Sequence, residues 1–254
     1  MLEFRNVDFS YGRQPVLKDV TFSVAKRETL VILGGSGSGK STILRLLLGL
    51  IEADSGNILV DGQDITQYRH AEMVELRKKM GMVFQEGALF DSLTVGENVG
   101  YFLLEHGFRG RKHGVEVEEK VREMLKLVGL EHTLDMMPDE LSGGMRRRVA
   151  TARSLIYEPE FMLYDEPTTG LDPATCESLC DLVNDVKRYR AVSSIFVTHN
   201  LDDAWRVADH FLLLRQGRVL WSGTAGELRE RPEDTLRRFF QGEVLEGLGG
   251  RQAP

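Results

Sequence analysis

The chain has 254 residues, with 32 Lys and Arg against 39 Asp and Glu and a formal net charge of -7. This length can bury a full core, either as one large domain or as a core with an inserted subdomain. The acidic balance argues against a general nucleic-acid binder, and apolar stretches such as residues 43–51 fall short of the roughly 20 residues of a spanning helix.

The first 24 residues alternate in the manner of strands. Extended segments are expected at 2–9 and 16–24, joined by a turn at 10–13 in which Tyr11 is an aromatic tip. The N-terminus carries no apolar signal region, so we expect a cytosolic chain.

A glycine-rich loop follows the apolar run 30–33 and precedes the apolar helix expected from residue 42. Its sequence, Gly34-Gly35-Ser36-Gly37-Ser38-Gly39-Lys40-Ser41, fits the phosphate-loop pattern G-x-x-x-x-G-K-[ST] in its strand–loop–helix context. Backbone N–H groups of the loop and the dipole of the following helix favour a bound phosphate. Lys40 can reach the terminal phosphates of a nucleotide, and the Ser41 hydroxyl can bind magnesium. A flexible turn would not need this spacing, and no register of these glycines fits the dinucleotide pattern G-x-G-x-x-G.

The middle of the chain predicts a strand at 55–62, a helix at 70–79 and a strand at 80–85. From 85 to 159 strand signals give way to two apolar stripes at helical spacing, so we expect a helical insertion. The stripes comprise Val95, Val99, Phe102 and Leu103, and Val117, Val121, Leu125 and Val128. Residues 107–114 are predicted to form an exposed, solvated basic loop between the two helices.

Strand and helix signals then alternate to residue 221. Strands are expected at 161–166 and 193–197, helices at 173–188 and 201–207, and a hairpin from 211–214 and 218–221. This order predicts an α/β fold with a largely parallel sheet and helices on both faces. The tail, 242–254, is predicted to be disordered or ordered by a partner. Cys176 and Cys180 match no metal or redox pattern and are predicted to be reduced packing residues.

Two acids end the strand expected at 161–166. Asp165 lies where open α/β sheets bind ligands and can share a magnesium ion with Ser41. Glu166 can take a proton from an attacking water. The competing interpretation is that these acids only cap a helix or end the strand.

A second anion site is predicted at Ser142-Gly143-Gly144, which begins a helix. By itself Ser142 is an N-cap. Two consecutive glycines weaken a helix start, however, and are tolerated where a ligand approaches the backbone. Because the phosphate loop already binds a nucleotide, we expect this site to meet a phosphate held by another copy of the chain.

These motifs, in this order and together with Gln85, 170–172 and His199, resemble the ATP-binding cassette ATPases over about residues 1–240. The resemblance implies a P-loop NTPase (RecA-like) core with a mainly parallel sheet, an N-terminal antiparallel β subdomain and an inserted α-helical subdomain. The implied domains are the core with its β subdomain at 1–84 and 160–240, the helical subdomain at 85–159, and a flexible tail at 241–254.

The same resemblance implies ATP and Mg²⁺ as ligands and assigns residue roles. Glu166, His199, Gln85 and Lys40 are expected to be catalytic, and Ser41, Gln85 and Asp165 to hold the metal. Tyr11 would stack on adenine, Gln85 would relay the ligand state to the helical insertion, and Asp172 would couple two sites across a head-to-tail dimer. The residues expected to bind nucleotide are Tyr11, Gly34, Gly35, Ser36, Gly37, Ser38, Gly39, Lys40, Ser41, Thr42, Ser142, Gly143, Gly144 and Asp172.

Within that family, Met145 in the signature, with 146–150, 84–95 and 164–173, resembles the ATPases of Mla/Mce-type phospholipid transporters. Glu86 departs from the small polar residue expected there. The family resemblance implies a second copy of the chain and integral membrane permease subunits, and this subtype adds a membrane-anchored lipid-binding subunit and a small regulatory domain protein. The chain would then lie peripherally on the cytoplasmic face of the inner membrane, with no nucleic acid.

Two alternatives share the catalytic motifs: the ATPase of an importer for small polar solutes such as amino acids, and a soluble cassette ATPase of DNA repair or translation. The soluble types usually carry a long coiled coil or two cassettes, and this chain has neither. The basic run 146–148 could indicate acidic ligands, but we expect it to be solvated or paired with neighbouring groups.

Overall fold

The computed structural model describes residues 1–105 and 111–230. In its N-terminal strands, buried and more exposed side chains largely alternate along the chain. Strands β1 (Leu2–Tyr11) and β2 (Gln14–Val24) pair antiparallel, and β4 (Ser55–Val60) and β5 (Gln63–Asp64) complete a sheet of order β2-β1-β4-β5. Gly12, at φ 60°, supplies the left-handed turn between β1 and β2. The turn is shorter than the 10–13 expected, so Tyr11 ends a strand.

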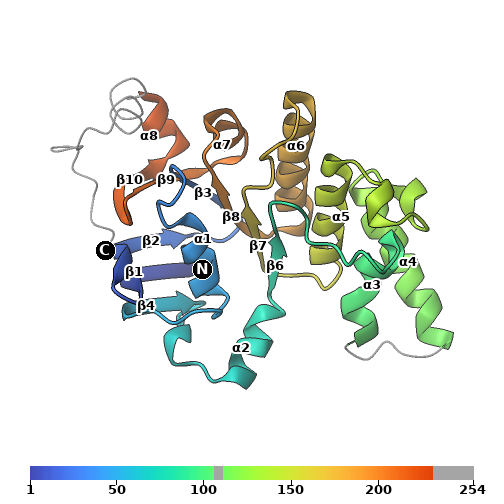
Figure 1. Cartoon of the computed structure of the whole chain (residues 1–254), viewed down its shortest axis with the longest axis horizontal. Coiled ribbons are helices and arrows are strands. Elements are labelled where there is room, and N and C mark those ends of the chain that lie inside the picture. The colour runs from blue at the N-terminus through green and yellow to red at the C-terminus, as the bar shows by residue number, and fades with distance from the viewer. Residues whose placement is uncertain (106–110, 231–254) are drawn as a thin grey trace.

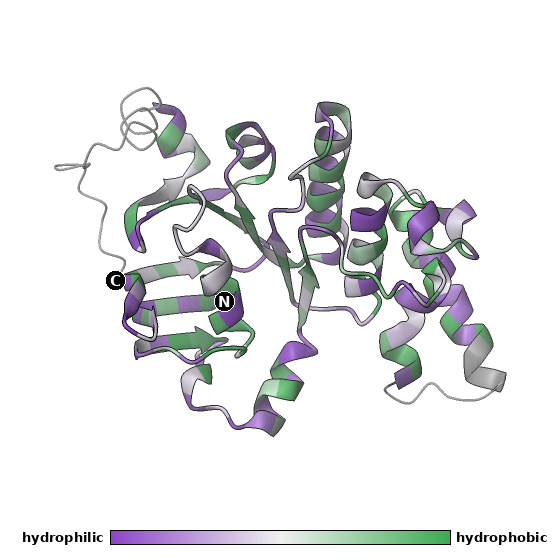
Figure 2. Cartoon of the chain, viewed as in Figure 1, coloured by the Kyte–Doolittle hydropathy of each residue, from purple (hydrophilic) through white to green (hydrophobic). Residues whose placement is uncertain are grey.

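The second sheet has six strands in the order β10-β9-β3-β8-β7-β6. Its strands are β3 (Thr29–Leu33), β6 (Met80–Val83), β7 (Phe161–Asp165), β8 (Ser193–Thr198), β9 (His210–Arg215) and β10 (Arg218–Thr224). All neighbouring pairs are parallel except the β9–β10 hairpin. Every residue of β3 is buried, as expected of a parallel strand covered on both faces, and Figure 2 shows hydrophobic residues gathered on these strands.

Two hydrophobic cores lie on opposite faces of the six-stranded sheet, because successive side chains of a strand point to opposite sides. Leu30 and Ile32 of β3 join the core shared with the antiparallel sheet, whereas Val31 and Leu33 join the other core. The helices of this part are α1 (Lys40–Leu47), η1 (Ile65–Gln67), α2 (His70–Arg77), α6 (Pro173–Arg190), α7 (Leu201–Val207) and α8 (Ala225–Glu230). The predicted α/β fold is confirmed.

The helical segment lies at the opposite end of the molecule from the antiparallel sheet (Figure 1). It comprises α3 (Val95–Glu105), α4 (Arg111–Leu127), η2 (Glu131–Thr133), η3 (Pro138–Glu140) and α5 (Gly143–Leu155). The apolar stripes face inward: of the eight residues, all but the partly buried Phe102 are at most 6% exposed. The boundaries predicted at 84/85 and 159/160 stay predictions.

Part of the predicted basic loop is wrong, because α4 begins at Arg111 and residues 111–114 are helical. The rest of that prediction, residues 107–110, and the predicted tail at 242–254 lie outside the described residues. Within 1–105 and 111–230, no helix combines the length and the apolar character needed to cross a bilayer.

The loop after β6 is held by one buried amide. Asn98 of α3 is 0% exposed. Its Oδ1 accepts from Phe90 N at 2.8 Å, and its Nδ2 donates to the carbonyls of Phe90, Leu93 and Thr94 at 3.0 Å each. Arg153 of α5 adds bonds to the carbonyls of Gly87 and Ala88 at 3.1 and 2.8 Å. Side chains of the helical segment therefore set the path of the loop that follows Gln85.

We expect Asn98→Ala to lower the free energy of unfolding by about 2–4 kcal/mol, because partly buried backbone groups of the loop lose four hydrogen bonds to a buried side chain. Urea denaturation followed by circular dichroism measures this. The matched control is Asn184→Ala, since Asn184 donates one bond, to the Arg206 carbonyl at 3.0 Å; its cost should stay within about 1 kcal/mol. Equal stability of the Asn98 variant and the native chain would contradict the interpretation.

Candidate active site

The glycine-rich loop connects β3 to α1 through two left-handed glycines, Gly37 at φ 73° and Gly39 at φ 109°. The φ of Gly39 is one that other residues rarely adopt, and a Cβ there would also lie 2.6 Å from the Leu17 side chain and 3.3 Å from the Val16 carbonyl, so glycine is strongly favoured. The Gly217 N–H bonds the Ser38 carbonyl at 3.1 Å and ties the loop to the β9–β10 turn. The loop is thus a braced backbone cradle and not a flexible linker.

Lys40 lies within this cradle and is 5% exposed. Its ammonium donates to the carbonyls of Gly34 and Gly35 at 2.8 and 3.0 Å, and lies 3.1 Å from Glu166 Oε1. Ser38 Oγ has no hydrogen-bond partner among the described residues although Ser38 is 6% exposed. A buried cation and an unpartnered hydroxyl at a helix N-terminus fit a bound phosphate.

The Ser41 hydroxyl donates to Asp165 Oδ1 at 2.9 Å, across 124 residues of sequence. Burial raises the pKa of the Asp165 carboxyl, and the neighbouring Glu166 adds to this, while the bond from Ser41 opposes it. Mg²⁺ prefers oxygen donors and takes one or two carboxylates together with substrate phosphates. Ser41, Asp165 and the side-chain carbonyl of Gln85 match that donor set, so these residues fit the ion predicted from the sequence.

Glu166 follows β7 in a left-handed conformation at φ 48°, with its N–H bonded to the Val197 carbonyl at 2.9 Å. Thr169 Oγ1 donates to Glu166 Oε2 at 2.8 Å, and His199 Nδ1 lies 2.5 Å from the same oxygen. Burial pushes the pKa of Glu166 upward, but the bonds from Thr169, Lys40 and His199 outweigh it and hold the pKa below its ordinary value. Glu166 is therefore an anionic carboxylate, as a proton acceptor must be.

Gln85 lies two residues past the end of β6 and lines three neighbouring cavities. The first, of about 430 Å³, is also lined by Tyr11, Gly37, Lys40, Ser41 and Asp165. The second, of about 730 Å³, brings the phosphate loop together with His199. Gln85 thus lies between the residues predicted to bind nucleotide and the helical segment, and its role as a relay stays a prediction.

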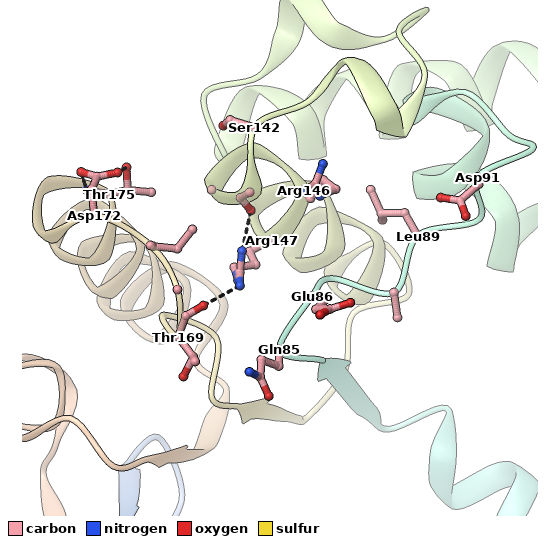
Figure 3. A pocket seen from close by; sticks show the side chains of 15 residues that line it. Gln85, Glu86, Leu89, Asp91, Ser142, Arg146, Arg147, Thr169, Asp172 and Thr175 are labelled. Atoms are coloured by element: carbon pink, nitrogen blue, oxygen red, sulfur yellow. Dashed lines mark hydrogen bonds between the residues drawn. The ribbon is translucent and has the colours of Figure 1, made fainter.

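The third cavity, of about 1010 Å³, is lined by the signature residues Ser142, Gly143 and Gly144 and by Asp172 (Figure 3). Ser142 caps α5, its Oγ accepting from Met145 N at 3.3 Å. Asp172 caps α6 by accepting from Thr175 N at 3.1 Å. Within one chain the signature glycines do not line the cavities of the phosphate loop. The roles predicted for these residues stay predictions.

Tyr11 lines the smallest of these cavities and is 45% exposed. Its ring lies edge-on to Phe9, with centroids 4.8 Å apart, and its hydroxyl accepts from Arg45 Nη1 at 3.1 Å. An exposed, braced aromatic face beside the phosphate loop suits a purine ring. Thr42, the last of the predicted nucleotide-binding residues in this loop, lines the same cavity.

The basic run 146–148 is paired with backbone carbonyls. Arg146 donates to Leu141 O at 2.8 Å, Arg147 to Gly143 O and Thr169 O at 3.0 and 2.7 Å, and Arg148 to Val128 O at 2.8 Å. Of the two outcomes expected for this run, solvation or pairing, the structure shows pairing, and Arg147 is 7% exposed. Each of the three guanidiniums thus has a backbone acceptor within the chain, and Arg146 and Arg147 line the cavity at the signature residues.

Three contacts of the site escaped the sequence analysis: Thr169 on Glu166, Arg45 on Tyr11, and Arg215 beside the phosphate loop. The sequence contains no signal for them, because each joins residues whose proximity depends on the fold or on a turn. Cys176 and Cys180 are free thiols, and burial raises the pKa of Cys180 to about 12, as expected of packing residues. The part of the chain that the structure describes has no cluster of three or more His, Cys, Asp or Glu suited to a metal.

Comparison with known proteins gives consistent matches. The family model described as "ABC transporter" matches residues 17–169. The methionine import ATP-binding protein MetN 1 of Staphylococcus aureus (strain N315) is 37% identical over 250 residues, covering 97% of this chain and 72% of MetN 1.

Solved structures agree with this match. CbiO1 from Clostridium perfringens, described as part of the ABC transporter complex CbiONQ, superposes with a TM-score of 0.83 at 29% identity, covering 94% of each chain. The ATP-binding cassette MJ0796, described as dimeric and bound to ADP and Pi, superposes with a TM-score of 0.79 at 31% identity, covering 88% of this chain and 98% of that one.

We expect Lys40→Ala to weaken ATP binding about 10- to 100-fold, because a charged hydrogen bond to phosphate contributes about 1.5–3 kcal/mol. Isothermal titration or a fluorescent nucleotide measures the Kd. Lys78→Ala is the control, since Lys78 is a surface residue paired with Glu75 at 2.6 Å. Equal affinity of the Lys40 variant and the native chain would remove Lys40 from the phosphate site.

Proposed function

The chain belongs to the ABC transporter family of ATP-binding proteins, and from that premise we propose that it is the ATP-hydrolysing subunit of a membrane transporter. Cassettes of this family hydrolyse ATP to drive transport. The observation that carries the proposal for this chain is the convergence of Lys40, Ser41, Asp165 and Glu166 at the carboxyl edge of the six-stranded sheet.

This convergence supports phosphoryl transfer to water. The loop amides and Lys40 hold the phosphates, and Glu166, kept anionic by its neighbours, accepts the proton of the attacking water. His199 orients Glu166 and steadies the terminal phosphate. A magnesium ion held by Ser41, Asp165 and Gln85 would neutralise phosphate charge. The Glu166 carboxylate, rather than His199, is the group positioned to take the proton.

The active assembly that we propose is a head-to-tail dimer. The signature residues Ser142, Gly143 and Gly144 present a helix N-terminus at a cavity separate from the phosphate loop of the same chain. A second copy would bring its bound ATP to that helix N-terminus, where backbone amides and the helix dipole favour a phosphate. The dimeric form described for MJ0796 supports this assembly.

Membrane partners follow from the same proposal. CbiO1 is described as part of a transporter complex, and we expect separate permease subunits to hold this chain on the cytoplasmic face of the inner membrane. The exposed aromatic rings of Phe84, Phe90 and Tyr101 lie on and around the loop that carries Gln85, with Phe90 and Tyr101 centroids 4.7 Å apart. Apolar surface at this position supports contact with a permease there.

Two cargo classes remain under the proposal. The relatives support import of a small polar solute such as an amino acid, because MetN 1 is a methionine import protein and matches nearly the whole chain. Met145 and its flanks instead support the phospholipid subtype, with its lipid-binding and regulatory subunits. The matches favour the first class over the phospholipid class, which was the main expectation from the sequence.

Purification of the tagged chain from detergent-solubilised membranes of its own organism, followed by mass spectrometry of proteins and lipids, discriminates these classes. A permease with a solute-binding protein supports amino-acid import. A permease with enriched phospholipid and a lipid-binding subunit supports lipid transport. Recovery of ribosomes or DNA ends without a permease would overturn the transporter proposal.

We expect Glu166→Gln to keep ATP affinity within about twofold and to lower kcat by about 100-fold or more, because general-base catalysis contributes about 10²–10⁴. Phosphate release measures turnover, and light scattering should detect an ATP-dependent dimer. Glu160→Gln is the matched control, since Glu160 is about half exposed and, among the residues that the structure describes, pairs with surface Lys79 at 3.1 Å. Unchanged hydrolysis by the Glu166 variant would remove Glu166 from the base role.

A further inference from the structure

Arg147 is a buried cation inside the signature helix. It lies on the second turn of α5 and is 7% exposed. A buried charge is costly unless it is paired and hydrogen-bonded. Nη1 donates to the carbonyl of Gly143 at 3.0 Å, one turn back on the same helix. Nη2 donates to the carbonyl of Thr169 at 2.7 Å, which lies on the loop after β7.

The guanidinium therefore joins two functional segments of one chain. Figure 3 shows it between the N-terminus of α5 and the Thr169 loop, with one hydrogen bond on each side. Only an arginine fork carries two N–H groups in fixed directions toward two carbonyls, so lysine would not reproduce the geometry. Arg147 thus connects α5 of the helical segment to the loop that follows β7 of the six-stranded sheet.

Thr169 continues the link to the proposed base. Its Oγ1 donates to Glu166 Oε2 at 2.8 Å, and its N–H donates to the Glu166 carbonyl at 3.2 Å. Glu166 itself has a left-handed backbone, at φ 48°, a conformation that a non-glycine residue holds only when its surroundings enforce it. The turn 166–169 is therefore a constrained unit, and Arg147 anchors its far end.

Glu86, the residue that departs from the expected small polar type, lies on the same cavity as Arg147 (Figure 3). Burial lowers the pKa of Arg147, and the adjacent Arg146 lowers it further, whereas the negative charge of Glu86 raises it. A guanidinium keeps its proton in proteins, so the negative charge of Glu86 on this cavity offsets part of the cost of burying the Arg147 cation.

We propose that Arg147 is a positioning residue that orients Glu166 for hydrolysis by fixing the Thr169 loop to the signature loop. This inference rests on the proposed function. Any phosphate that engages the signature loop at Gly143 then acts on a segment bonded, through Arg147 and Thr169, to the base of the same chain. The link lies within one chain and is separate from Gln85.

The test compares Arg147→Lys and Arg147→Met in the full chain by steady-state ATP hydrolysis. We expect kcat to fall about 10- to 100-fold, because small displacements of a catalytic group cost about that much. ATP affinity and the number of ATP bound per chain should stay within about twofold of native. Lysine keeps the charge but only part of the geometry, so its kcat should exceed that of methionine.

The matched control is Arg148→Lys. Arg148 lies on the same helix and donates to the Val128 carbonyl at 2.8 Å and to Ser178, away from the Glu166 loop. Its kcat should stay within about twofold of native. If Arg147→Lys merely unfolded the chain, bound ATP per chain would fall in proportion to turnover. Turnover per bound ATP separates the two cases, and no decrease in that ratio would overturn the proposal.

A double-mutant cycle with Thr169→Val tests the route. If Arg147 acts through Thr169 on Glu166, the double variant should lose little more kcat than the worse single variant. If the fold losses in kcat of the two single variants instead multiply in the double variant, Arg147 does not act through Thr169. Native chain without ATPase activity, or full activity of Glu166→Gln, would instead defeat the proposed function. Native hydrolysis with the Arg147 variants unaffected would defeat only this inference.

Discussion

The hydrogen bond between Ser41 and Asp165 is the contact on which the site depends. It exists because β3 and β7 both flank β8 in a parallel sheet, so that their carboxyl ends open at one edge. That edge brings the phosphate loop within 3.1 Å of Glu166 across more than a hundred residues. The two hydrophobic cores on opposite faces keep the strand order, because β3 contributes alternate side chains to each. Packing far from the site thus determines where the carboxylates meet the loop.

Side chains of the helical segment donate hydrogen bonds to backbone carbonyls of the loops at that edge of the sheet. Asn98 and Arg153 hold the loop after Gln85, and Arg147 holds the loop after Glu166. In each case an amide or guanidinium from a helix donates to backbone that has no regular secondary structure. Such bonds give exposed or partly buried loop carbonyls a partner within the chain. They also make the position of the helices and the position of the catalytic loops mutually dependent, which is what a transporter ATPase requires if nucleotide and permease are to sense one another.

Much of this architecture follows from local pattern. The apolar run before Gly34 predicts a buried strand, and the stripes beginning at Val95 and Val117 predict the inward faces of α3 and α4. The expected strand at 80–85 stops at Val83, since the loop that holds Gln85 is set by tertiary contacts and not by propensity. The helix start at Arg111 was missed because charged residues without a visible apolar stripe resemble a loop. The cargo class inferred from Met145 is not supported by the relatives, since a signature residue reports the ATPase more directly than the permease's substrate.

By itself the sequence determined the phosphate loop, the two acids after an apolar strand and the signature helix start, because each depends on residues adjacent in the chain. Only the tertiary structure decided that Tyr11 ends a strand against Arg45, that Asp172 caps its own helix, and that Arg147 is buried between two loops. In the sequence, residues 146–148 are three equivalent cations. In the structure, each arginine donates to different backbone carbonyls. The hydrogen-bond partners of a guanidinium depend on which backbone lies beside it. That proximity is determined by helix packing and strand order and not by the adjacent residues in the sequence.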